Sequence, residues 1–233
     1  MADETSLDQI QLPSVASLVY DAVRREILLG RLAQNEQLNL SKLEQQLGVS
    51  RTPLKMALSR LEEEGLIEIS PRRGTYVRAF SERDIRECYE LRIALEVYAL
   101  RHVFEPQNAA ILAEITELFR RMDGYFDSPE TYVDDIPPFA DMDRSVHAKI
   151  VELAGNTRMT QVYERANVQG YIALMGSRFE YADTLKTVGE HQRILRALEA
   201  HDLDEVLEAG RLHLVQAGER AVRRLAARQE RES

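Results

Sequence analysis

Apolar side chains recur every three or four residues along most of this 233-residue chain, and that spacing predicts a mainly α-helical protein. In the N-terminal third it predicts a helix over residues 18–28 that stops at Gly30, followed by two shorter helices on either side of Gly48. Residues 67–70 and 75–78 alternate between apolar and polar side chains around a Pro-Arg-Arg-Gly turn, which is typical of a two-stranded hairpin. We therefore expect three helices and a hairpin in one small N-terminal domain.

The helical spacing continues after residue 80 without any alternating segment, so we expect an antiparallel bundle of six or seven helices there. Ser81 is a suitable N-cap, with Asp84 completing a capping box, and Pro106 ends the first long helix. Pro129, Pro137 and Pro138 are expected in the loop before the third helix of the bundle. The helices after Pro106 are predicted over residues 109–126, 134 or 139 to 154, 158–180, 182–200 and 203–228.

Composition describes a soluble globular protein, with 44% hydrophobic and 30% charged residues. No apolar run approaches the roughly 18 to 20 residues that a membrane span requires, so no membrane association is expected. Cys88 is the single cysteine, which excludes an internal disulfide and suits a reducing cytoplasm. We therefore expect a cytoplasmic protein.

Charge is distributed unevenly between the two halves. The formal net charge of −9 argues against a nucleic-acid partner for the chain as a whole. Residues 14–80 nevertheless carry +2, whereas the residues from Ser81 onward carry −8. Because attraction to phosphates acts within about a Debye length, of roughly 10 Å, the N-terminal domain can still bind DNA.

The segment 47–55, Leu-Gly-Val-Ser-Arg-Thr-Pro-Leu-Lys, is typical of a helix-turn-helix that presents its second helix to the major groove. Gly48 allows the sharp turn because a residue without a Cβ adopts left-handed conformations cheaply, and Ser50 can cap the next helix by accepting an amide hydrogen bond. The alternative is an ordinary pair of capped helices with solvated basic side chains. The residues expected to contact DNA are Arg51, Thr52, Lys55, Arg72 and Arg73, with Ser50 and Lys42 as phosphate partners.

Histidine is rare in the chain, and three of the five histidines lie in apolar helical settings of the second half. Asp143 and His147 are four residues apart and therefore share one helix face, and His191 and His213 lie on two later helices. Three imidazoles and a carboxylate that converge in a bundle core could bind a divalent metal ion with coordination positions left open. Spacing alone leaves the commoner alternative open, in which these histidines are simply packed and hydrogen-bonded.

Residues 14–80 resemble the winged helix-turn-helix domain of GntR-type bacterial transcription regulators. The family usually has Arg-Glu where this chain has Lys55 and Met56, and lysine keeps the charge but loses the two-pronged contact with guanine. The matching blocks are residues 29–32, 43–48, 49–53, 57–61, 64–66 and 72–74.

Residues 81–228 resemble the FCD-type ligand-binding domain of the FadR branch of the same family. The resemblance implies a divalent metal ion held by an aspartate and three histidines, with zinc favoured and nickel or manganese as alternatives. The family usually has Phe where this chain has Val146, which alters pocket packing but no ligand. The matching blocks are residues 90–96, 143–147, 154–156, 190–198 and 213–214. The implied metal ligands are Asp143, His147, His191 and His213, whereas His102 and His201 match no ligand position.

Arg92 is a candidate for binding an anionic effector beside the metal, because a guanidinium can grip a carboxylate at two points. An ion pair with Glu96, four residues further on, is the equally weighted alternative.

The expected protein is a homodimeric, ligand-responsive transcription regulator that binds double-stranded operator DNA, most often a repressor in the family that it resembles. A small organic acid would be the effector. The expected organisation is a flexible tail at residues 1–13, a winged helix-turn-helix domain at 14–80 and an all-helical effector-binding and dimerisation domain at 81–229. The alternatives are a metal-dependent hydrolytic or lyase-type enzyme that uses the bundle site, and a helical scaffold that keeps the first domain only for assembly.

Overall fold

The computed structural model describes residues 13–28, 30–79, 81–123, 125, 132–174 and 180–232 of the chain. It divides into two compact units, Met1–Arg78 and Ala79–Ser233. Each unit is described separately below, and the expected tail at residues 1–13 lies almost wholly outside the described residues.

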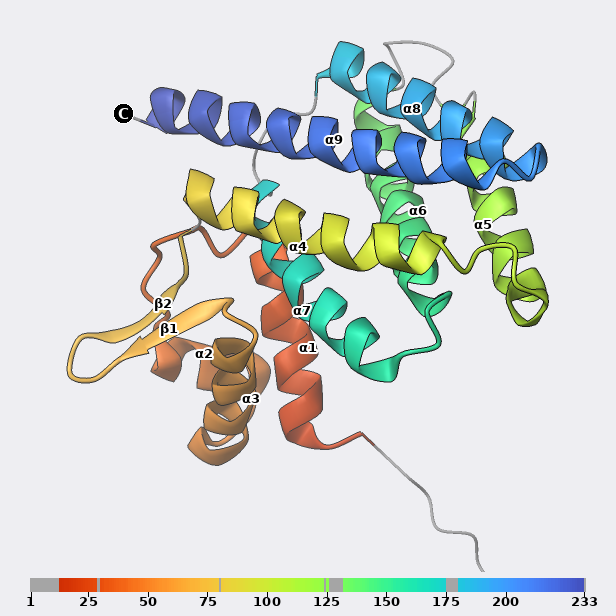
Figure 1. Cartoon of the computed structure of the whole chain (residues 1–233). Coiled ribbons are helices and arrows are strands. Elements are labelled where there is room, and N and C mark those ends of the chain that lie inside the picture. Colours follow the sequence, from red (N-terminus) through yellow and green to blue (C-terminus); the bar gives the residue numbers. More distant parts are fainter. Residues whose placement is uncertain are drawn as a thin grey trace, which may run out of the picture. The chain divides into compact units, whose positions relative to one another are not determined.

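The first unit consists of three helices and a two-stranded antiparallel hairpin (Figure 1). The hairpin pairs Ile67 with Val77 and Ser70 with Gly74, so its second strand begins one residue earlier than the sequence pattern predicts. The elements are α1 (Val15–Leu28), α2 (Leu40–Leu47), α3 (Arg51–Glu63), β1 (Ile67–Ser70) and β2 (Gly74–Val77).

Helices α1 and α3 pack against each other because each presents an apolar face at helical spacing. Val23 and Ile27 of α1 are buried, as are Leu54, Leu58 and Leu61 of α3. This small core fixes α3 and leaves its opposite face in solvent.

The turn between α2 and α3 has the conformation that the sequence predicts. Gly48 ends α2 with φ +64°, in the left-handed region, and its amide donates to the carbonyl of Glu44. At the start of α2, the Asn39 side chain accepts a hydrogen bond from the amide of Lys42. Ser50 occupies the N-cap position of α3, but its side chain makes no capping hydrogen bond, so that part of the prediction was wrong. Extended backbone at Ser50 defines the helix start without the side-chain bond.

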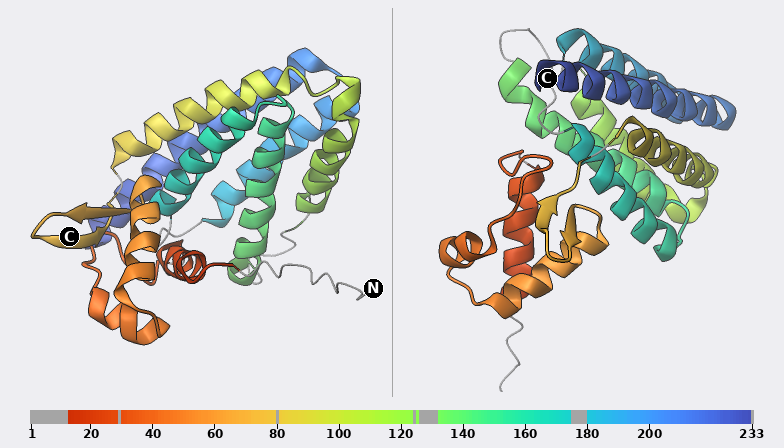
Figure 2. Two further views of the ribbon diagram at one scale, coloured as in Figure 1. Left: turned by 90° about the horizontal axis from the view of Figure 1, so that it is seen from below. Right: turned by 90° about the vertical axis from the view of Figure 1, so that its left-hand side faces the viewer.

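The second unit is a bundle of six α-helices among the described residues, with one short 3₁₀ turn. Helix α9 lies between α4 and α8 in Figure 1, and α7 runs along α4 in the left view of Figure 2. Its elements are α4 (Glu82–Leu100), η1 (Pro106–Asn108), α5 (Ala109–Met122), α6 (Tyr132–Glu152), α7 (Thr157–Leu174), α8 (Tyr181–Glu199) and α9 (Leu203–Glu232).

The bundle begins with the predicted capping box. The Ser81 side chain accepts from the amide of Asp84, and the Asp84 carboxylate accepts from the amide of Ser81. The core beyond it is assembled from α4, α5, α6, α8 and α9 around fully buried side chains such as Ile115, Phe119 and Val146. Val146, which stands where the family pattern has phenylalanine, is therefore part of the core and directly precedes His147 in the sequence.

Several predicted helix limits differ from the structure. Pro137 and Pro138 lie inside α6, so their predicted place in a loop was wrong. Proline removes one backbone donor but has a φ close to the helical value, and the apolar spacing on both sides of the pair is helical. Helix α5 ends at Met122, four residues before the predicted end. Residues 175–179, over which α7 was predicted to continue, lie outside the described residues, as does Pro129.

No helix among the described residues is both long enough and apolar enough to cross a membrane.

Replacing Gly48 by Ala should lower the free energy of unfolding by about 1 kcal/mol, because an L-residue is strained at this φ. A Cβ at Gly48 would meet no atom within 4 Å, so the loss comes from the backbone alone. Gly189→Ala is the matched control, since Gly189 has equally open surroundings but lies within helix α8. We expect that control to be neutral or stabilising. Urea unfolding of both variants measures the difference, and equal effects would contradict the strain at Gly48.

Candidate functional site

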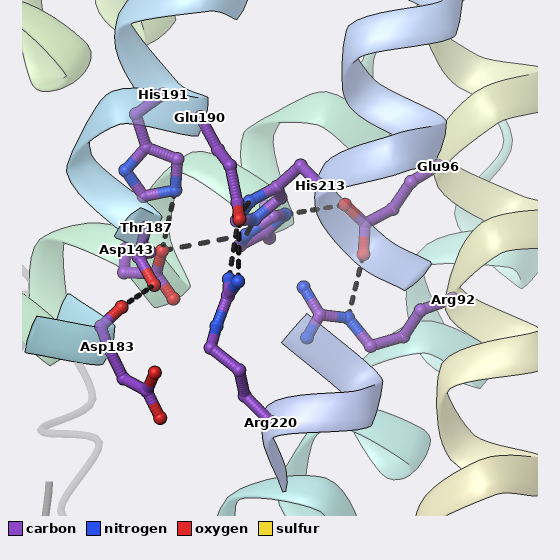
Figure 3. Close-up of polar contacts among 10 residues, drawn as sticks. Arg92, Glu96, Asp143, Asp183, Thr187, Glu190, His191, His213 and Arg220 are labelled. Carbon is purple, nitrogen blue, oxygen red and sulfur yellow. Dashed lines mark hydrogen bonds and ion pairs between the residues drawn. The ribbon is translucent and has the colours of Figure 1, made fainter. Parts of the chain in front are cut away.

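Three helices of the bundle bring the four predicted metal ligands together (Figure 3). Asp143 and His147 lie one turn apart on α6, His191 lies on α8, and His213 lies on α9. One potential ligand atom from each residue lies within 4.8 Å of all the others. The three histidines are buried, and Asp143 is partly exposed. Helix packing thus brings together residues that are up to 70 positions apart in the sequence.

The donor atoms face one another at short range. The Oδ1 atom of Asp143 lies 3.2 Å from Nε2 of His191 and 3.6 Å from Nε2 of His147. The Nε2 atoms of His147 and His213 are 3.2 Å apart. Two nitrogens bound to one zinc ion at about 2.1 Å would be about 3.0 Å apart at a right angle and about 3.4 Å apart in a tetrahedron. The observed spacing suits a shared cation.

Two carboxylates, the buried Glu96 and the partly buried Glu190, orient the histidines from outside the cluster. Glu96 of α4 contacts Nδ1 of His147 at 2.6 Å, and Glu190 of α8 contacts Nδ1 of His213 at 2.8 Å. A carboxylate on Nδ1 fixes the ring so that Nε2 faces the centre, which is the usual arrangement around metal-bound histidines. Sequence reasoning assigned no role to Glu190 and treated Glu96 only as a partner for Arg92.

Each of these carboxylates is also paired with an arginine. Nε of Arg92 donates to Glu96 at 2.8 Å, one turn away on α4. Nη1 and Nη2 of Arg220 on α9 donate to the two oxygens of Glu190, both at 2.6 Å (Figure 3). Two Arg–Glu–His chains therefore converge on the cluster, and the second of them was missed because Arg220 and Glu190 are 30 residues apart.

The pKa values of the cluster follow from burial and from these contacts. Burial acts to raise the pKa of Asp143, but the positive charge at His147 holds it well below its usual range. Burial acts to lower the pKa of His147, but the Glu96 carboxylate raises it to about 9. Burial lowers the pKa of His213 to about 4, although its hydrogen bond with Glu190 opposes that shift.

The unsatisfied atoms of the site also fit a cation. Among the described residues, both ring nitrogens of His191 and the Oδ1 atom of Asp143 are buried without a contact of hydrogen-bond geometry, although Nε2 of His191 lies 3.2 Å from that oxygen. Buried polar atoms without a partner are rare in folded proteins and call for an explanation such as an ion. One carboxylate with three imidazoles is a donor set that first-row divalent metals accept. The residues therefore fit a metal ion.

A cavity of about 90 Å³ adjoins the cluster, beside Asp143, His147 and His213. Since a cavity of about 10–15 Å³ is enough to hold one water, this one has room for a small molecule of several non-hydrogen atoms. Arg92 and Arg220 both line it, so two guanidinium groups stand beside the potential ligands. The sequence left open whether Arg92 pairs with Glu96 or stands at an effector site. In the structure Arg92 pairs with Glu96 and also borders the cavity.

The candidate DNA contacts form an exposed set in the first unit. Lys42 lies in the first turn of α2, and Ser50 directly precedes α3. Arg51 also pairs with Glu44 at 3.0 Å, so one basic group of the set has an acidic neighbour. The exposed side chains at the start of α3 are Arg51, Thr52 and Lys55, and those of the hairpin turn are Arg72 and Arg73.

The remaining two histidines lie outside the cluster. His102 follows α4 and contacts Glu105 at 2.7 Å, whereas the ring of His201 stacks on Phe104 with centroids 4.8 Å apart.

Comparisons with known proteins match both units. Residues 87–216 match the family model of the FCD domain, and residues 15–77 match that of the bacterial regulatory proteins of the gntR family. An uncharacterized helix-turn-helix transcriptional regulator from the TAR-I ttuE-ttuC′ intergenic region of Agrobacterium vitis is 33% identical over 65% of this chain and 87% of its own length. A probable D-xylose utilization operon transcriptional repressor of Paenarthrobacter nicotinovorans is 29% identical over 88% of this chain and 87% of its own length.

A solved structure supports the fold. The crystal structure of a putative transcriptional regulator GntR from Rhodococcus sp. RHA1 matches with a TM-score of 0.74, covering 90% of this chain and 98% of that one. Its sequence identity is 20%, so this likeness concerns the fold alone. The predicted fold class, a winged helix-turn-helix followed by a helical bundle, is confirmed.

Replacing Arg92 by Met should lower the free energy of unfolding by about 3 kcal/mol, because it leaves the Glu96 carboxylate, 1% exposed, without its guanidinium. Arg86→Met is the matched control: Arg86 pairs with Glu82 on the same helix, but both side chains are exposed. That control should cost less than about 1 kcal/mol. Chemical denaturation measures the free energy of unfolding of both variants. Similar losses would show that the buried Arg92–Glu96 pair contributes no more to stability than the exposed Arg86–Glu82 pair.

Proposed function

Because the chain belongs to the GntR family of bacterial transcription regulators and carries an FCD domain, we propose that it is a ligand-responsive repressor. Its first unit would bind double-stranded operator DNA. Its second unit would hold a divalent metal ion and a small organic-acid effector that adjusts this binding. The observation that carries the proposal is the cluster of Asp143, His147, His191 and His213 beside a cavity bordered by two arginines.

The DNA contacts are assigned to the exposed residues of α2, α3 and the hairpin turn. Arg51, Thr52 and Lys55 would enter the major groove, since the N-terminal residues of a recognition helix contact base edges. Arg72 and Arg73 would reach phosphates or a neighbouring groove from the hairpin, with Lys42 and Ser50 as further phosphate partners. Lys55 would act as a point charge, because lysine lacks the fork that grips guanine.

The metal ligands would be Asp143, His147, His191 and His213, with zinc favoured and nickel or manganese as alternatives. A divalent cation at this place would offer an open coordination position to a carboxylate oxygen. Glu96 and Glu190 would keep the Nε2 atoms of His147 and His213 directed at it.

The effector is assigned to the cavity next to these ligands. Arg92 and Arg220 would provide positive charge for an anion, and the cavity size favours a small carboxylate. Arg92 uses Nε for Glu96, so the pair leaves the guanidinium tip for a second acceptor. This assignment makes the effector a small organic acid rather than a neutral sugar.

The regulatory step follows from linkage. An effector can release the operator only if it binds the free protein more tightly than the DNA-bound protein. A cytoplasmic homodimer would place two recognition helices in successive major grooves of a palindromic operator, and the effector would favour a dimer geometry that no longer fits both half-sites. The family consists of transcription regulators, so the metal site is assigned to sensing and not to catalysis.

Metal content tests the second unit. After incubation of the purified full chain with Zn²⁺ and dialysis, we expect about one bound ion per chain by elemental analysis, because the four donors form one site. His191→Ala and His213→Ala should lose the ion. Glu190→Gln should retain it with an affinity lowered about 10- to 100-fold, as for other groups that orient a ligand. His102→Ala is the control and should bind as the unaltered chain does. Zinc binding that survives both ligand substitutions would contradict the assignment.

Salt dependence of DNA binding tests the first unit. With an operator fragment selected from a random duplex library, Lys42→Ala and Arg73→Ala should each reduce the slope of log K against log salt by about one, because each removes one phosphate-neutralising charge. Arg120→Ala serves as the control, since Arg120 is an exposed arginine of the second unit that pairs with Glu199. Fluorescence anisotropy at several salt concentrations gives the slopes. An unchanged slope for both variants would remove these residues from the DNA interface.

A further inference from the structure

The solvent face of α3 carries an apolar side chain near its centre. Successive residues of an α-helix are turned by about 100°, so Thr52, Met56 and Ser59 lie opposite the buried side of this helix. Met56 is 60% exposed. Single exposed apolar residues are common on protein surfaces, so the place of Met56 on α3 matters here and not its exposure alone. The side chains that α3 buries are those of Leu54, Ala57, Leu58 and Leu61.

We propose that Met56 reads thymine in the major groove by contacting the C5-methyl group of that base, with the methyl group of Thr52 as a second apolar contact one turn earlier. Thymine is the base whose edge presents a methyl group in the major groove. The unbranched, polarisable thioether of methionine adapts well to such a group. This inference deepens the proposed function and rests on it, because α3 must first enter the groove.

The basic residues of α3 lie at the edges of this face and not at its centre. Arg51 and Lys55 lie on one side of Met56, and Arg60 lies on the other. Arg51 pairs with Glu44 at 3.0 Å. The guanidinium of Arg60 lies 3.7 Å from the centroid of the Tyr20 ring. Charges at the edges suit the phosphates on the two sides of a groove, whereas neutral side chains at the centre suit the base edges between them.

A methionine at the centre discriminates between base pairs in two ways. It gains an apolar contact with the methyl group of thymine, and it has no donor for guanine. A cytosine in place of the thymine would bring an amino group against an apolar side chain that offers it only a weak acceptor, which is unfavourable. Met56 should therefore favour a T·A pair over a C·G pair at one position of the bound duplex.

The first test removes the methyl group from the DNA. The full chain selects a duplex from a random library, and each thymine of that duplex is then replaced, one at a time, by uracil, which lacks only the methyl group. At the thymine that Met56 contacts, the unaltered chain should bind about fourfold more weakly, as expected for one buried methyl group. Met56→Ala should bind the thymine and uracil duplexes equally at that position. Fluorescence anisotropy at one fixed salt concentration measures both affinities.

Leu18→Ala is the matched control for this test. Leu18 is 54% exposed on α1 of the same unit, so the substitution also removes a large exposed apolar side chain, but outside α3. It should keep every effect of uracil that the unaltered chain shows. Circular dichroism confirms that both variants are folded, which we expect because both side chains are exposed.

The second test returns the methyl group on a different base. A C·G pair at the position that Met56 contacts should weaken binding by the unaltered chain about tenfold or more, as expected for one wrong base pair. A 5-methylcytosine·G pair should recover about fourfold of that loss, because it restores the methyl group alone. Met56→Ala should bind the two cytosine duplexes equally.

The outcomes separate this contact from the wider proposal. If every effect of uracil persists in Met56→Ala, Met56 does not read thymine, whereas the DNA-binding regulator stands. Recovery with 5-methylcytosine in both chains would likewise assign the methyl contact to another residue. A full chain that selects no duplex at all would overturn the proposed function together with this inference.

Discussion

The bundle depends on the pairing of two carboxylates, the buried Glu96 and the partly buried Glu190. Glu96 and Glu190 each lie between a histidine and an arginine, and a buried carboxylate without such partners would cost several kcal/mol. The partners come from different helices: α4 and α6 meet through Glu96 and His147, and α8 and α9 meet through Glu190 and its contacts. A shift of any of these helices would break a charged hydrogen bond at the histidine cluster. The two chains of contacts therefore fix the helices and, by fixing them, the positions of the histidines.

The sequence predicted those features that depend on local spacing. The capping box at Ser81, the left-handed Gly48 and the shared face of Asp143 and His147 all arise from residues within a few positions of one another. Convergence of His191 and His213 on that face was implied by family resemblance, because helical periodicity says which side of a helix is buried but not which helix covers it. The interhelical contact of Glu96 with His147 and the pairing of Glu190 with Arg220 were missed for the same reason. Their only local signals were acidic residues at otherwise apolar helix positions.

The errors at Ser50 and at the proline pair have a different origin. A capping residue was taken to imply a capping hydrogen bond, but backbone conformation and water can serve a helix start without one. Two prolines were taken to imply a loop, but the structure places them six and seven residues into α6, counted from its first residue, and the proline φ is compatible with a helix. In both cases a preference of single residues was outweighed by the pattern of the whole segment, as is general for local propensities.

Helix α4 connects the effector cavity with the surface of the second unit. Arg92 and Glu96 lie on its buried face, next to the cavity and the histidines, whereas Leu91 and Tyr98 lie on its exposed face. An effector at the guanidinium tip of Arg92 would leave the pair with Glu96 in place, so a movement of Arg92 would be transmitted to the helix that carries both residues. An α-helix of 19 residues moves as a rigid body over short distances, so the exposed face of α4 would shift together with the buried face. Such coupling would act only to the extent that the ligand prefers one position of α4 over another.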